Sequence, residues 1–140
     1  MNYHRLIVLP ALLITVTATA QTSVSPAEKI VEHHLASADS RNVEEIVRDY
    51  ADDAILISPD GVNKGKQAIH TAFQQMMAQQ PFPALTTTRK VFEGNVGYIT
   101  WTMNAGQPNA VSGTDTFIIR NGKIVVQTVA ILTPPAPAKP

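Results

Sequence analysis

One carboxyl group stands out because the sequence places it on the apolar side of a predicted strand. Asp115 lies in the segment GTDTFIIRNGKIVVQTVAIL, where the Asn-Gly pair at 121–122 is typical of a two-residue hairpin turn. This turn sets Arg120 opposite Lys123 and predicts that Asp115 lies opposite Thr128. The predicted inner face is mainly apolar and consists of Asp115, Phe117, Ile119, Ile124, Val126, Thr128, Ala130 and Leu132. The predicted outer face is more polar and includes Thr114, Thr116, Arg120, Lys123 and Gln127.

This position gives Asp115 two interpretations. An apolar wall raises the pKa of a carboxyl group, which could keep it neutral and able to donate a hydrogen bond to a ligand carbonyl. Alternatively, Asp115 is a structural acid that accepts a hydrogen bond from Thr128 or from an amide at a strand end. Asp115 is the first candidate for a functional residue on the first interpretation.

His34 is the second candidate. The segment Ser25-Pro26-Ala27-Glu28 combines a capping box with proline at the first helical position, which predicts a helix over about 26–38. His34 falls on the apolar stripe of this helix and His33 falls outside it. His34 could therefore be a general acid or base, or a core histidine bonded to a backbone carbonyl. Adjacent helical residues point apart and no third ligand is suitably spaced, so we expect no metal at His33 and His34. Acid-base chemistry requires no organic cofactor, and we expect none.

Several residues could form the wall of a binding site around these two groups. Trp101 shares one face of its predicted strand with Met103, and Phe117 shares the face of Asp115. Aromatic planes of this kind suit a flat hydrophobic ligand, although plain core packing would use the same residues. Tyr50 could reach a pocket with its hydroxyl group, or end at solvent at a helix terminus.

The elements that must position these residues follow from local signals. A second helix is capped by Asn42 with Glu45 three residues later, buries Tyr50, and ends at the pair 52–53. A third helix begins at Gly65 and stops before Pro81. A strand is predicted over 54–58, and a turn at 59–61 leads into a short second strand that ends at Lys64. Four longer strands are predicted over 86–92, 96–105, 111–120 and 123–133. This order predicts an α+β domain with helices packed on one face of a curved antiparallel sheet.

Composition sets the limits of the chain. It has 140 residues, no cysteine, 44% hydrophobic residues and balanced charge, which fits one core without disulfides and makes nucleic acid an unlikely partner. Residues 1–20 read as a secretory signal peptide with cleavage near Ala20. The mature domain then covers 21–133, followed by a proline-rich tail at 134–140. We expect the protein to be exported to the periplasm or secreted from the cell, without stable membrane insertion.

The order of elements and three segments, YADDAILISPDG, GKQAIHTAF and GTDTFIIRNGKI, resemble the nuclear transport factor 2-like (NTF2-like) superfamily, in particular its SnoaL-like and ketosteroid isomerase-like branch. The resemblance implies a cone with a deep apolar pocket between sheet and helices, and a homodimer formed through the sheet. In ketosteroid isomerase two groups form an oxyanion hole, and their positions fall on His34 and Asp115. The position of the catalytic base falls on Ser58, which cannot accept a carbon-bound proton without a partner.

The resulting expectation is an exported protein that holds a small hydrophobic carbonyl compound. Asp115 and His34 would be its polar groups, with Trp101, Tyr50 and the remaining wall residues around the ligand. Catalysis would be acid-base chemistry such as isomerisation, dehydration or ring closure, with His34 moving a proton and Asp115 holding the carbonyl oxygen. The alternative is a module without catalysis, used for ligand binding or dimeric assembly.

Overall fold

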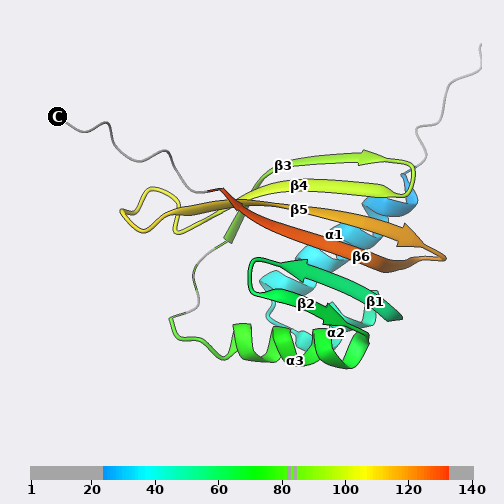
Figure 1. Cartoon of the computed structure of the whole chain (residues 1–140). Helices are drawn as coiled ribbons and strands as arrows, with labels where there is room; N and C mark the ends of the chain where they lie inside the picture. Colours follow the sequence, from blue (N-terminus) through cyan, green and yellow to red (C-terminus); the bar gives the residue numbers. More distant parts are fainter. Residues whose placement is uncertain (1–23, 82, 84, 133–140) are drawn as a thin grey trace, which may run out of the picture.

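The computed structural model describes residues 24–81, 83 and 85–132, and within these ranges it contains three helices and six strands (Figure 1). The helices are α1 (Pro26–Asp39), α2 (Val43–Arg48) and α3 (Lys66–Met77). The strands are β1 (Tyr50–Ser58), β2 (Gly61–Lys64), β3 (Leu85–Glu93), β4 (Val96–Met103), β5 (Val111–Arg120) and β6 (Lys123–Leu132). The predicted signal peptide, its cleavage site and the proline-rich tail lie outside the described residues. No helix in the described part of the chain is long and apolar enough to span a membrane.

Both N-terminal helices begin at the predicted caps. The Ser25 hydroxyl group accepts a hydrogen bond from the Glu28 amide at 3.0 Å, and the Asn42 side chain accepts one from the Glu45 amide at 3.2 Å. The predicted end of the second helix is wrong, because α2 stops at Arg48 and Tyr50 already belongs to β1. Pairing with the sheet overrides the helical pattern here.

The sheet has the order β2-β1-β6-β5-β4-β3. Its neighbouring strands are antiparallel except for β1 and β6, which run parallel, so the sheet is mixed where the sequence predicted an antiparallel one. The helices lie on one face: α1 contacts β3, β4 and β5, whereas α3 contacts β1 and β2 (Figure 1). This arrangement confirms the predicted α+β architecture with helices packed against a curved sheet.

The pairing of β5 with β6 contains an irregularity that moves the register by one residue. The two pairs nearest the turn form as predicted, but Ile118 then pairs with Val126. Asp115 consequently lies opposite Val129, and the prediction that it lies opposite Thr128 is wrong. The extra residue is a β-bulge, which no local signal in the sequence marked.

This bulge exchanges the two faces of β6 beyond Val125. Gln127, predicted on the outer face, points inward and is only 3% exposed. Val126 and Leu132, predicted inside, turn to the outer face instead. The inner surface of the sheet therefore gains an amide side chain that the unbulged register had placed outside.

Candidate functional site

The carboxyl group of Asp115 lies at the centre of a hydrogen-bonded network on the concave face of the sheet. The Trp101 indole Nε1 donates to Asp115 Oδ1 at 2.8 Å, and the Gln127 amide Nε2 donates to Asp115 Oδ2 at 2.7 Å. The Tyr50 hydroxyl group donates in turn to Gln127 Oε1. Two residues from β4 and β6 thus bind the carboxyl group on β5 directly, and Tyr50 from β1 supports it through Gln127.

Burial determines the electrostatics of this network. Removal from water raises the pKa of Asp115, while the hydrogen bonds from Trp101 and Gln127 favour its charged form and oppose the rise. Burial also raises the pKa of Tyr50, with a further contribution from the charge of Asp115. The neutral form of Asp115 is therefore more accessible than that of an ordinary surface carboxylate.

Trp101 reaches Asp115 because its neighbour on β5 has no side chain. Gly113 pairs with Trp101, and a Cβ atom at Gly113 would lie 2.2 Å from Trp101 Cζ2 and 2.8 Å from the Ala130 carbonyl oxygen. The indole ring therefore lies over the bare backbone of Gly113. The absence of a Cβ atom at this position is what allows Trp101 Nε1 to donate to the carboxyl group.

The concave face is accessible near this ring. Ile131 lies opposite Gly113 on the inner side of the sheet but is 42% exposed, and Met103 on the next strand is only partly buried. Asp115 itself is 9% exposed, more than Gln127 or Trp101. A ligand that reached Asp115 would approach across Ile131, Met103 and the indole.

The deeper interior is occupied by side chains. Phe117 and Tyr50 are fully buried, and the ring of His34 meets both edge-on at centroid distances of 5.4 and 5.5 Å. Phe73 on α3 closes the cluster. Two hollows of the described surface are lined by other residues. The deep pocket implied by the resemblance is thus largely filled by aromatic packing.

The His34 ring lies close to the carboxylate of Asp49 rather than to that of Asp115. No hydrogen bond joins the two among the described residues, and His34 Nδ1 is buried without a hydrogen-bond partner. Burial lowers the pKa of His34 to about 4, despite a hydrogen bond with the Ile46 backbone that raises it, and nearby His33 lowers it further. His34 is therefore a neutral core residue at physiological pH.

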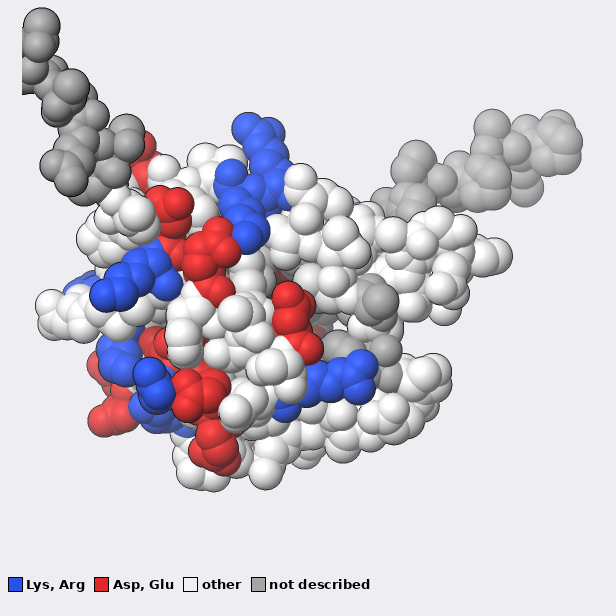
Figure 2. Space-filling model, turned by 180° about the vertical axis from the view of Figure 1, so that it is seen from behind, with Lys and Arg blue, Asp and Glu red and all other residues white. Residues whose placement is uncertain are grey.

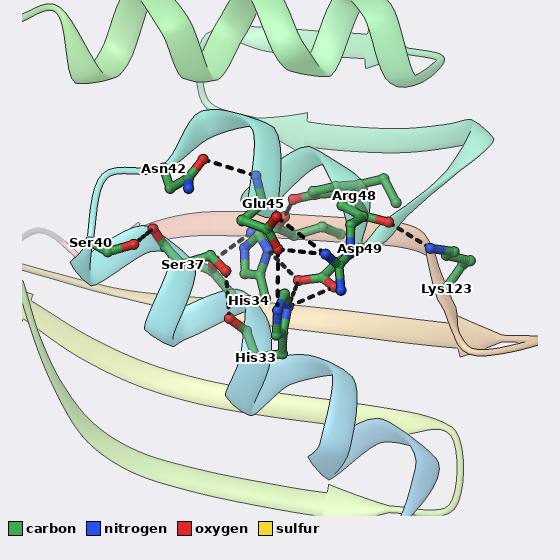
Figure 3. A network of polar contacts seen from close by, with 12 residues as sticks. His33, His34, Ser37, Ser40, Asn42, Glu45, Arg48, Asp49 and Lys123 are labelled. Atoms are coloured by element: carbon green, nitrogen blue, oxygen red, sulfur yellow. Dashed lines mark hydrogen bonds and ion pairs between the residues drawn. The ribbon is translucent and has the colours of Figure 1, made fainter.

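Asp49 is the acid that sequence reasoning missed, and Figure 3 shows its carboxylate close to the two adjacent histidines. Both Asp49 oxygens lie within hydrogen-bond distance of His33 Nδ1, at 2.9 and 2.8 Å, and Asp49 Oδ2 lies 4.0 Å from His34 Nδ1. Burial raises the pKa of Asp49, and the hydrogen bond from His33 opposes that rise. An acid at a helix C-terminus opposes the helix dipole, a signal that could have marked Asp49 as needing a partner.

The remaining predicted site residue is peripheral. Ser58, at the base position of the resemblance, is half-buried at the end of β1 next to the turn that leads to β2. No described hydrogen bond joins Ser58 to Asp115. The structure therefore joins Trp101 to Asp115 directly and Tyr50 to Asp115 through Gln127, and leaves Ser58 outside this network.

Tyr50→Phe tests the inner end of the network. The substitution removes only the hydroxyl group and leaves the buried Gln127 Oε1 without its donor, so we expect a loss of about 1 to 2 kcal/mol in the free energy of unfolding. Urea titration measures this loss, and Tyr98→Phe on the convex face is the matched control. Equal effects of the two substitutions would contradict a stabilising role for the network.

The fold with its buried acid defines an α+β cone of the NTF2-like class. Solved structures with this fold include an NTF2-like protein of unknown function from Cytophaga hutchinsonii ATCC 33406, which is 13% identical with a TM-score of 0.64, over 79% of this chain and 93% of that one. A hypothetical protein with a ketosteroid isomerase-like fold from Catenulispora acidiphila DSM 44928, in complex with trimethylamine, is 18% identical with a TM-score of 0.63, over 73% and 84%. TerC, co-crystallised with polyporic acid, is 15% identical with a TM-score of 0.66, over 76% and 92%.

The family follows from the sequence match itself. Residues 31–127 match the SnoaL-like domain, and the chain belongs to this family. Among curated proteins, none matches the chain. The predicted resemblance is therefore confirmed at the level of family and fold.

Proposed function

We propose that this protein binds a small, largely apolar molecule on its concave face, and that Asp115 is the polar group that contacts the ligand. The observation that carries the proposal is the orientation of Asp115: Trp101 and Gln127 each donate to one of its oxygens, and the residue keeps a small exposed edge, 9% of its surface. A neutral Asp115 could donate its proton in a hydrogen bond to a ligand carbonyl at that edge. The first twenty residues favour an exported protein.

Small-molecule binding has precedent on this fold. The Catenulispora acidiphila protein was solved with trimethylamine and TerC with polyporic acid. In this chain the accessible inner surface offers the apolar side chains of Ile131 and Met103 beside the Trp101 ring. Such a surface suits an apolar ligand body, while Asp115 fixes its single polar group.

If the protein is an enzyme, we place proton transfer on Asp115. A carboxyl group with a raised pKa can exchange a proton with a ligand near neutral pH, as isomerisation, dehydration or ring closure requires. His34 is less suited, because it is enclosed by aromatic rings and has no described contact with Asp115. This assignment departs from the sequence-based expectation that His34 would move the proton.

A ligand screen with matched variants tests the proposal. We expect compounds from a panel of small carbonyl, aromatic and steroid-like molecules, including polyporic acid and trimethylamine, to raise the melting temperature of the protein. A ligand at a hundredfold its Kd stabilises by about 2.7 kcal/mol. The shift should disappear in Asp115→Asn and persist in Asp53→Asn, which alters an exposed carboxylate on β1.

The outcomes separate binding from assembly. A shift that survives Asp115→Asn would place the ligand elsewhere and overturn the assignment of Asp115. No shift with any compound, together with a dimer in light scattering, would favour the alternative of a non-catalytic assembly module. A homodimer through the convex face remains part of the proposal, since that face carries the exposed apolar residues Val96 and Leu132.

A further inference from the structure

A hollow that the Asp115 network does not line opens on the helical side of the molecule. A cleft of about 250 Å³ opens between α1, the end of α2 and the turn that joins β5 to β6. Its lining consists of Lys29, Ile30, His33, Arg48, Asp49, Gly122 and Lys123. The cleft shares no residue with the network around Asp115, so it requires a separate explanation.

The lining of this cleft is predominantly basic. Three cationic side chains face one carboxylate, whereas the other hollow has two acids, Glu32 and Asp39, against the single cation Lys90. The chain as a whole is balanced in charge, and Figure 2 shows acidic and basic side chains interspersed without a broad area of one sign. The positive excess is therefore a local property of the cleft.

Within the lining of the cleft, the Asp49 carboxylate is hydrogen-bonded to His33. The Asp49 side chain is 8% exposed, and both of its oxygens lie within hydrogen-bond distance of His33 Nδ1. The His33 side chain is 41% exposed. A carboxylate bonded to Nδ1 fixes that nitrogen as a donor and leaves Nε2 for a partner outside. His33 is thus held as an oriented imidazole at the edge of a basic cleft.

Two further groups face this imidazole. Glu45 Oε2 lies 3.6 Å from His33 Nε2, but the same carboxylate forms an ion pair with Arg48, whose NH1 lies 3.0 Å from Oε2 and donates to Oε1 at 3.2 Å. On the inner side, His34 lies behind Asp49. Lys123 Nζ donates to the Arg48 carbonyl oxygen at 2.7 Å, which places its charge at the cleft wall.

We propose that this cleft binds a small anion through a carboxylate or phosphate group. A protonated His33 donates Nδ1–H to Asp49 and Nε2–H to the anion, which takes the place of Glu45 beside Nε2. Lys29 and Lys123 supply the surrounding positive charge, and Glu45 stays paired with Arg48. The cleft, of about 250 Å³, has room for a small acid or a single phosphate group.

Nuclear magnetic resonance of the histidine side chains tests this proposal. The full chain is titrated at pH 5.5 and constant ionic strength with inorganic phosphate and, separately, with acetate. We expect a saturable shift of the His33 ring signals with at least one of them. Tighter binding of phosphate would identify a phosphate ligand, and tighter binding of acetate a carboxylate ligand.

Two lysine variants distinguish a site from general salt effects. Lys29→Gln removes an exposed charge from the cleft and should weaken binding about fivefold, because a close unit charge contributes on the order of 1 kcal/mol. Lys64→Gln makes the same change on β2 and should leave binding unaltered. Shifts that fail to saturate, or that weaken equally in both variants, would overturn the proposal. In His33→Gln the reporting ring is absent, so binding to the folded variant is measured by calorimetry, and retained binding would overturn the role of His33.

Discussion

The free energy of unfolding should fall by about 3 kcal/mol when Gly113 is replaced by alanine. The added Cβ atom would lie 2.2 Å from the Trp101 ring and 2.8 Å from the Ala130 carbonyl oxygen. The backbone oxygen cannot move without disturbing the β5–β6 pairing, so the indole must leave its place and give up its hydrogen bond to Asp115. Trp101 is the single tryptophan of the chain, so its fluorescence during urea titration reports both effects directly.

Gly97→Ala is the matched control for this experiment. Gly97 is also a buried glycine on the concave face, but its added Cβ atom would first meet Val31 Cγ2 at 3.0 Å, the end of a side chain that can shift. We expect a loss of about 1 kcal/mol, with Trp101 emission unchanged in the folded protein. A Gly113→Ala protein as stable as Gly97→Ala, with native emission, would show that the ring does not need the bare backbone.

Acidification should destabilise the protein through His34. Its pKa is about 4 in the folded protein and near 6.5 when unfolded, so between these values the unfolded chain binds the proton and the folded protein does not. The contribution of His34 to stability is therefore complete above pH 6.5 and is lost as the pH falls to 4. The difference in pKa corresponds to about 3 kcal/mol.

His34→Leu should remove this dependence, because leucine has no proton to gain. Asp49 and Asp115 act in the opposite direction, since their raised pKa values let the folded protein take up protons first and gain stability as the pH falls. These two groups remain in both proteins, so the difference between wild type and variant isolates His34. Urea titrations at pH 7.5, 5.5 and 4 measure it.

Phe73→Leu provides the control for general loss of packing. Phe73 contacts the His34 ring and does not titrate, so its truncation should lower stability by a similar amount at every pH. If His34→Leu kept the full pH dependence of the wild type, the imidazole would not be the group that charges on unfolding. The buried, unpartnered Nδ1 atom would then need another explanation.

The helices and most strands could be predicted because their signals are local. The caps at Ser25 and Asn42 satisfy amide groups within three residues, and the Asn121-Gly122 turn fixes only its nearest pairs. The end of α2 could not be predicted this way. Its last turn competes with the pairing of Tyr50 and Ile124, residues far apart in the chain.

The candidate site could be predicted in part. The apolar face of β5 predicted a buried Asp115, and the helical stripe predicted a buried His34, and both positions are confirmed. The partners of Asp115 were not foreseen, because the bulge in β6 exchanges the faces of Gln127 and Thr128. His33 was expected at the surface, without its carboxylate partner Asp49.

By itself, the sequence determined where the helices begin, which faces of α1 and β5 are apolar, and that one acid and one histidine lie on such faces. These properties depend on interactions between residues a few positions apart in the chain, which do not require any distant contact to form. Only the tertiary structure decided that Asp115 is held by Trp101 and Gln127, and that Asp49 binds His33 and lies close to His34. These contacts join segments distant in the chain, and a one-residue bulge or the end of a helix changes which side chains meet.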